Sequence, residues 1–188
     1  MLIGVLLAGG KSARMGKDKA ALVLDGETLG ARAVRVLRAV CDDVVCAGHG
    51  RGVPEDVVRI ADPGDGPLVA LAGALALLKA AHASCSFVVL PVDMPGIQSA
   101  HLAKLIEAAR HAQGACFGIH GHIEPLPLVF AAAALPHLAE RVAQGEKRLS
   151  AGVRALSPAI VALTDAEQAL MRNLNTPTDL RAWLAEGR

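Results

Sequence analysis

Aromatic residues are scarce in this 188-residue sequence, which has three phenylalanines, one tryptophan and no tyrosine. A bound nucleobase is therefore expected to be held by backbone and aliphatic contacts rather than by aromatic stacking. The four cysteines are scattered and form no Cys-x-x-Cys pair, which argues against a disulfide framework or a structural zinc site. Three of them lie in or beside apolar segments, so we expect reduced, buried thiols.

Strong charge and long apolar runs are also missing. A net charge of +1 gives no overall attraction to nucleic acid or to an anionic membrane. The longest apolar stretch, 67–78, is too short to span a bilayer, and the apolar start lacks the basic flank of a signal peptide. These features predict a cytoplasmic protein. Hydrophobic residues make up 53% of the chain, which is enough for one domain over residues 1–188.

Apolar segments of strand length alternate with segments of helical periodicity. Strands are predicted over residues 3–7, 44–47, 57–60, 86–92, 115–119, 126–130 and 160–163. Helices are predicted over 29–40, 68–81, 99–111 and 135–142, with Ser99 as the N-cap of the third and a last helix after Thr176. This alternation predicts a three-layer α/β/α, Rossmann-like architecture with a mostly parallel central sheet.

A glycine-rich, basic loop follows the first predicted strand. Within residues 7–19 it contains Gly9, Gly10, Gly16, Lys11, Arg14, Lys17 and Lys19. Glycines let backbone N–H groups approach a ligand closely, and the cations can neutralise phosphate charge. An ordinary surface loop has no reason to bear the mutual repulsion of four cations. The segment therefore predicts the triphosphate-binding loop of a nucleotidyltransferase.

The spacing of the glycines excludes two commoner phosphate-binding loops. A Walker A loop has four residues between its first glycine and the Gly-Lys-Ser/Thr, whereas Gly4 and Gly10 are separated by five. The stretch from Gly10 to Gly16 has the same excess and ends in Asp18, which lacks the hydroxyl group. A dinucleotide fingerprint needs a residue between its first two glycines, but Gly9 and Gly10 are adjacent.

Two aspartates follow predicted strands, and ligands of an open α/β sheet lie beyond the carboxyl ends of its strands. Asp93 follows strand 86–92, between Pro91 and Pro95, and a carboxylate there suits a magnesium triphosphate. The alternative for Asp93 is that it caps the next turn. Asp62 follows strand 57–60 and has either a nucleotide or metal role or a simple role in the turn.

Other polar residues give weaker signals. His120 and His122 could share a strand face and bind a metal, although surface or core-edge histidines are the simpler interpretation. Arg148 could bind a second phosphate or begin a helix, and Asn173 and Asn175 could bind a polar substrate or form a turn. No Ser-His-Asp or Cys-His arrangement is evident, which suits a transfer that depends on positioning and charge.

Taken together, these segments resemble the molybdenum cofactor guanylyltransferases, which share the sugar-nucleotide transferase fold. The resemblance covers most of the chain and rests mainly on residues 7–19, on Pro-Val-Asp-Met-Pro at 91–95 and on Asn-Leu-Asn-Thr-Pro at 173–177. It implies transfer of GMP from GTP to the terminal phosphate of molybdenum-bound molybdopterin, which gives molybdopterin guanine dinucleotide and pyrophosphate. It also implies Mg²⁺ as cofactor and transient contact with the enzymes that receive the product.

The resemblance also implies roles for individual residues. Nucleotide binding is implied for Leu7, Ala8, Gly9, Gly10, Lys19, Asp62 and Asp93. Catalytic roles are implied for Arg14, Lys19 and Asp93, with Asp93 also the metal ligand. Acceptor binding is implied for Arg148, Asn173 and Asn175.

Some alternatives remain at this stage. Related cytidylyltransferases tend to have Ala-Ala-Gly in the first loop and glutamine after the metal aspartate, so Gly9, Gly10 and Met94 favour GTP. Family members often carry an asparagine at the end of the second strand, where this chain has Cys-Ala-Gly-His at 46–49. The other readings are a transferase for a different phosphorylated acceptor and a non-catalytic nucleotide-binding module.

Overall fold

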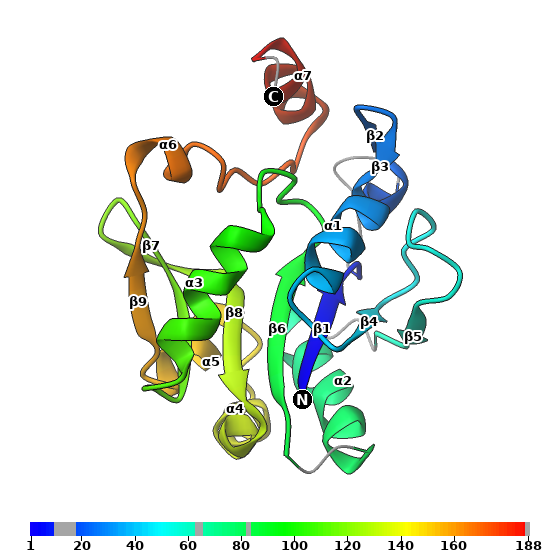
Figure 1. Ribbon diagram of the computed structural model, residues 1–188. Helices are drawn as coiled ribbons and strands as arrows, with labels where there is room; N and C mark the ends of the chain where they lie inside the picture. The colour runs from blue at the N-terminus through cyan, green and yellow to red at the C-terminus, as the bar shows by residue number, and fades with distance from the viewer. Residues whose placement is uncertain (10–17, 63–65, 82–83, 187–188) are drawn as a thin grey trace.

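The computed structural model describes residues 1–9, 18–62, 66–81 and 84–186. At its centre lies a seven-stranded sheet with the order β5-β4-β1-β6-β8-β7-β9 (Figure 1). Its strands are β1 (Leu2–Leu7), β4 (Asp43–Ala47), β5 (Val58–Ile60), β6 (Ser86–Pro91), β7 (Gly114–Ile119), β8 (His122–Ala131) and β9 (Ala159–Ala162). Strand β8 is antiparallel to β6 and β7, and the other pairs of this sheet are parallel. The prediction of a mostly parallel sheet is confirmed.

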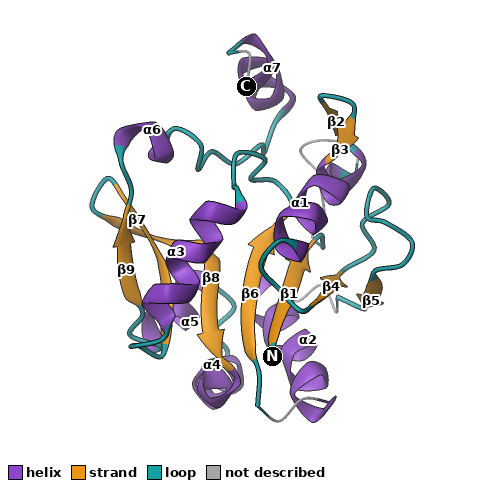
Figure 2. Cartoon of the chain, in the orientation of Figure 1, coloured by secondary structure: helices purple, strands orange, loops and turns teal. Residues whose placement is uncertain are grey.

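Helices cover both faces of the sheet (Figure 2). One layer contains α1 (Leu29–Arg38) and α3 (Ser99–Ala109), and the other contains α2 (Pro67–Ala81), α4 (Leu135–Ala143) and α5 (Leu149–Ala155). Along β1, Ile3 and Val5 are buried in one core cluster and Leu6 in the other, because successive side chains of a strand point to opposite faces. This burial on both faces explains the uninterrupted apolar pattern and confirms the three-layer architecture.

The prediction that Ser99 caps α3 was wrong, because Gln98 occupies the N-cap position. The backbone N–H of Gln98 donates a hydrogen bond to Nδ1 of His101 at 3.0 Å, so the third helical residue closes the first turn. Ser99 is the first residue inside the helix. The general preference for short hydroxyl side chains at N-caps is overridden here by the buried His101.

The final helix begins as the sequence predicts. Thr176 is the N-cap of α7 (Pro177–Ala185), and its Oγ1 accepts a hydrogen bond from the N–H of Asp179 at 3.1 Å. Asp179 in turn accepts from the N–H of Thr176 at 2.7 Å. Hydrogen bonds from Thr176 and Asn175 hold the pKa of Asp179 below its usual value. This reciprocal capping box fixes where the chain enters α7 after it passes the sheet.

Five short elements were not predicted from the sequence. They are η1 (Lys19–Ala21), the β2–β3 hairpin (Val23–Leu24 and Glu27–Thr28), η2 (Ala132–Ala134) and α6 (Asp165–Gln168). In this topology the carboxyl ends of all six mutually parallel strands lie at one edge of the sheet, where α6 is also found (Figure 1). Because β8 runs the other way, its first residues lie at the same edge. No helix in the described ranges is long and apolar enough to cross a membrane.

Candidate active site

Lys19 joins two distant segments at the carboxyl edge of the sheet. Its Nζ lies 2.8 Å from Oδ2 of Asp93 and donates a hydrogen bond to Oδ1 of Asn175 at 2.7 Å. The backbone N–H of Leu174 donates to the carbonyl oxygen of Asp93 at 2.8 Å, which holds these segments together. The side chains of Lys19 and Asp93 are 17% and 19% exposed, so their charges are only partly screened by solvent. The loop lysine and the strand-end aspartate therefore meet, as the sequence predicts.

Asp18 fixes the position of Lys19. Its carboxylate accepts hydrogen bonds from the N–H of Ala20 at 3.0 Å and from the N–H of Arg51 at 2.8 Å. The first bond caps η1, and the second ties this short helix to the loop after β4. A Cβ on Gly52 would lie 1.9 Å from the carbonyl oxygen of Ala20, so the same loop packs directly against η1. Asp18 is therefore a positioning residue for the lysine.

The first loop residues lie between the ends of two neighbouring strands. The carbonyl oxygen of Leu7 accepts a hydrogen bond from the N–H of Val92 at 3.1 Å. The N–H of Ala8 donates to the carbonyl oxygen of Ala47 at 3.0 Å. The last residue of β1 is thus bonded to Val92, the residue before Asp93. These contacts place Leu7 and Ala8 at the edge where a nucleotide-binding role is predicted for them.

Gly9 lies where three segments converge. A Cβ on Gly9 would be 2.0 Å from Oδ2 of Asp62, so the Asp62 carboxylate lies against the Gly9 backbone. Gly48 approaches from the other strand, because a Cβ there would lie 2.6 Å from the backbone nitrogen of Gly9. Gly48 also has a φ of +110°, which L side chains rarely adopt. Gly9, Gly48 and Asp62 therefore form a second group at this edge, on the β4–β5 side of Lys19.

Arg148 is not brought to Lys19 and Asp93 by any contact in the described part of the chain. Its Nε and Nη2 bind the Glu146 carboxylate at 3.1 and 3.0 Å. It is the N-cap of α5, which agrees with the alternative that it begins a helix. The preceding Lys147 lies against Gly66, because a Cβ on Gly66 would be 3.3 Å from the Lys147 Cβ.

Asn173 lies beside Asn175 but in a different environment. It lines a small cavity of about 70 Å³ that Asp179 and the buried Trp183 also line. Asn175 contacts Lys19, so the two asparagines extend from the lysine toward α7. Gly10 and Arg14, to which the sequence assigns nucleotide-binding and catalytic roles, lie outside the described residues.

Comparisons with known proteins agree with this arrangement. Residues 4–162 match the family described as the MobA-like NTP transferase domain. The chain belongs to this family. It is 39% identical to a probable molybdenum cofactor guanylyltransferase of Opitutus terrae, over 95% of this chain and 92% of the relative. It is 37% identical to a molybdenum cofactor guanylyltransferase of Xanthomonas euvesicatoria, over 93% and 89% of the two chains.

A solved structure shares the fold. The crystal structure of molybdopterin-guanine dinucleotide biosynthesis protein A from Archaeoglobus fulgidus superposes with a TM-score of 0.76, and all of both chains is covered at 22% identity. At this identity the likeness shows the fold. Family membership makes the chain a nucleotidyltransferase and confirms both the predicted fold and the predicted resemblance.

Glu124 is a further carboxylate near Asp93, and it was not predicted as a site residue from the sequence. Glu124 is in β8, the antiparallel neighbour of β6, and its carboxylate is near enough to Asp93 to feel that charge. Burial raises the pKa of Glu124, and the nearby negative charge of Asp93 raises it further. The nearness of Glu124 to Asp93 could not be predicted, because it depends on an antiparallel pairing of β8 with β6 that the sequence alone does not reveal.

A metal at this site would need ligands from outside the protein. No three His, Cys, Asp or Glu side chains are grouped to hold a metal in the part of the chain that the structure describes. Magnesium is commonly bound by one or two carboxylates together with phosphate oxygens and water. Asp93 and Glu124 have the right chemistry for that kind of site.

Replacing Gly48 by alanine should weaken GTP binding. The new Cβ would clash with the Gly9 nitrogen, and the residue would keep an unfavourable φ. We expect the dissociation constant for GTP to rise about tenfold, and strain at this position to lower the free energy of unfolding by about 1–3 kcal/mol. Calorimetric titration with GTP and urea denaturation measure the two effects.

Gly26 offers a matched control for Gly48. It has a φ of +80°, but none of the described atoms lies within 4 Å of a Cβ built there. Gly26→Ala should therefore lower stability through backbone strain and leave the GTP dissociation constant unchanged. Equal GTP affinity in both variants would show that the contact between Gly48 and Gly9 does not shape the nucleotide site.

Proposed function

We propose that this chain transfers GMP from GTP to the terminal phosphate of molybdenum-bound molybdopterin and releases pyrophosphate. The observation that carries the proposal is the contact of Lys19, just after the glycine-rich segment, with Asp93 at the carboxyl edge of the sheet. Relatives named molybdenum cofactor guanylyltransferase match nearly the whole chain, and this supports the choice of both substrates. The segments that carry the resemblance include both ends of that contact and Asn175.

The two groups of residues suggest how the substrates would be divided. Leu7, Ala8, Gly9 and Asp62 lie toward β4 and β5 and would hold the nucleotide. Asn173 and Asn175 lie on the other side of Lys19, toward α7, and would face the acceptor. Lys19 lies between the two groups, where the phosphates of the two substrates must meet.

The reaction needs charge and positioning more than a protein nucleophile. An oxygen of the acceptor's terminal phosphate attacks the α-phosphorus of GTP, and the bond from that phosphorus to the β-phosphate oxygen breaks in line. Pyrophosphate leaves with the added negative charge. Lys19 would neutralise this charge, and the resemblance gives Arg14 the same task. Such preorganised charges stabilise the transition state without rearranging during the reaction.

Magnesium would be held by Asp93, with Glu124 on the neighbouring strand as the second carboxylate. The Asp93 carboxylate already binds one cation, the Lys19 ammonium, which shows that its position suits positive charge. When bound, Mg²⁺ would withdraw negative charge from the phosphate groups. Lys19 would then share Asp93 with the metal and donate to a phosphate oxygen.

Turnover with different nucleotides tests the proposal. We expect the purified protein with molybdopterin and Mg²⁺ to release pyrophosphate from GTP at least about tenfold faster than from CTP or ATP. Omitting molybdopterin should abolish the release. Faster turnover with CTP would make the chain a cytidylyltransferase, and GTP binding without pyrophosphate would make it a binding module. The cytoplasm is the proposed place of this reaction.

A further inference from the structure

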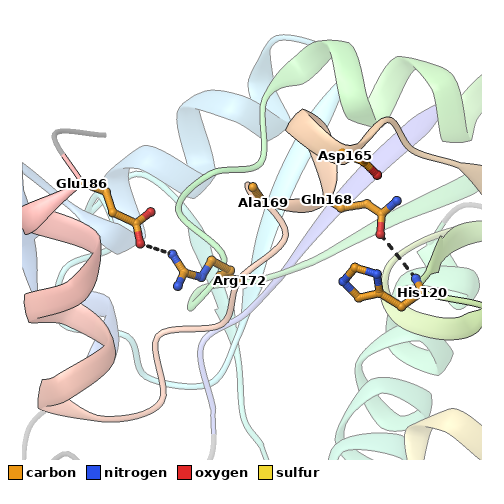
Figure 3. Close-up of a pocket in the computed structure, with 6 residues that line it drawn as sticks. All are labelled: His120, Asp165, Gln168, Ala169, Arg172 and Glu186. Carbon is orange, nitrogen blue, oxygen red and sulfur yellow. Dashed lines mark hydrogen bonds and ion pairs between the residues drawn. The ribbon is translucent and has the colours of Figure 1, made fainter.

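A larger cavity lies at the other half of the carboxyl edge, away from Gly9 and Asp62. Its volume is about 490 Å³, within the range of small-molecule sites. It lies beyond the ends of β7 and β9, and Figure 3 shows the side chains around it. The lining residues are His120, Asp165, Gln168, Ala169, Arg172 and Glu186.

The chain itself connects this cavity to the proposed catalytic centre. Arg172 lines the cavity, and Leu174, two residues further on, is hydrogen-bonded to the Asp93 backbone. Two residues span at most about 7 Å. Arg172 also lines the small cavity of Asn173. A molecule with its phosphate near Lys19 could thus extend past the asparagines into the larger cavity.

Two of the lining side chains are held in place by their neighbours. The Gln168 side-chain amide accepts a hydrogen bond from the backbone N–H of His120 at 3.4 Å. It donates one to the carbonyl oxygen of Leu163 at 3.1 Å. The Arg172 guanidinium is paired with the Glu186 carboxylate (Figure 3). Among the six residues drawn in Figure 3, Asp165 makes no hydrogen bond or ion pair with the other five. Asp165 is exposed and lines the cavity, so its carboxylate is accessible to a molecule bound there.

We propose that this cavity binds the pterin ring of the acceptor and that the Asp165 carboxylate recognises its 2-amino and N3–H groups. This inference rests on the proposed function. The two donors of the pyrimidine edge lie side by side, and a carboxylate accepts two parallel hydrogen bonds with good geometry. All three phenylalanines and Trp183 are buried, so the planar groups available to the ring face are His120 and Arg172.

Guanine has the same amino and N–H edge as a pterin, so the location of the cavity decides between them. The groups proposed for the nucleotide follow β1, β4 and β5, whereas the cavity follows β7 and β9. Strand β6, which leads to Asp93, lies between these two halves. In an in-line transfer the acceptor oxygen enters opposite the leaving pyrophosphate. Because the nucleotide is proposed to bind at the β4–β5 half, the cavity is left to the acceptor.

Pterin fluorescence tests the inference directly. We expect free pterin to bind the wild-type protein at pH 7 and to bind the Asp165→Asn variant at least about tenfold more weakly. Lumazine, which has an oxygen in place of the 2-amino group, should bind the wild type about tenfold more weakly than pterin does. The asparagine amide can pair with the lumazine edge, so Asp165→Asn should lose the preference for pterin.

A turnover measurement separates this inference from the proposed function. Asp165→Asn should raise KM for molybdopterin about tenfold, while kcat and the KM for GTP stay unchanged. Asp25→Asn, at the exposed turn between β2 and β3, serves as the matched control. It should change the KM of neither substrate. The inference fails if the wild type does not bind pterin, if Asp165→Asn binds it as tightly, or if this variant loses GTP affinity instead. The proposed function fails separately if the wild type releases no pyrophosphate with molybdopterin.

Discussion

Replacing Lys19 by methionine is expected to lower the rate of pyrophosphate release from GTP by at least about a hundredfold. Lys19 is held between Asp93 and Asn175, so its ammonium is positioned before any substrate arrives. Loss of one preorganised charge from a phosphoryl-type transition state costs about 3 kcal/mol. Methionine keeps much of the length of the side chain but removes the charge. Initial rates at saturating GTP measure the effect on kcat.

Arg38→Met is the matched control for loss of a paired cation. Arg38 is at the end of α1 and is paired with Asp56, and both side chains are largely exposed. Exposed ion pairs contribute about 0–1 kcal/mol to stability, so this variant should fold and turn over normally. Wild-type kcat in Lys19→Met would remove Lys19 from the mechanism. A circular dichroism melt of both variants distinguishes lost catalysis from lost structure.

The sequence predicts the sheet well because its pattern follows directly from burial. Strand β1 is covered on both faces by helices, and its uninterrupted apolar run reflects this. Helix α6 was missed because four residues are too few to show helical periodicity. A local signal did exist, since Thr164 and Glu167 form a capping box that the spacing of the two residue types could have indicated.

The sequence predicts a site residue only where the place of that residue in the chain determines where its side chain lies in the fold. Asp93 was placed correctly because residues that follow parallel strands gather at one edge. Glu124 was overlooked because its position depends on the single antiparallel partner of β6 in the described sheet. The close packing of Asp62 against Gly9 depends on loop geometry, which no periodicity encodes. The Asp165 cavity combines three segments that are distant in the sequence.

Asp93→Asn is expected to reduce turnover by at least about a hundredfold and to weaken binding of Mg-GTP more than binding of metal-free GTP. The asparagine oxygen can still accept a hydrogen bond from Lys19, so the variant should keep the local structure while losing the negative charge. Magnesium prefers anionic oxygen ligands, and an amide is a poor substitute for a carboxylate. The difference between the two forms of GTP thus reports on the metal and not on folding.

Calorimetric titrations of GTP with Mg²⁺ and with EDTA measure this difference without relying on turnover. Asp56→Asn, the partner of Arg38 on the surface, removes a carboxylate elsewhere and should change neither titration. Equal losses for both forms of GTP in Asp93→Asn would mean that Asp93 acts only by orienting Lys19. Tighter binding of metal-free GTP by this variant would be consistent with a metal role, because the Asp93 charge repels phosphate when no divalent cation is present.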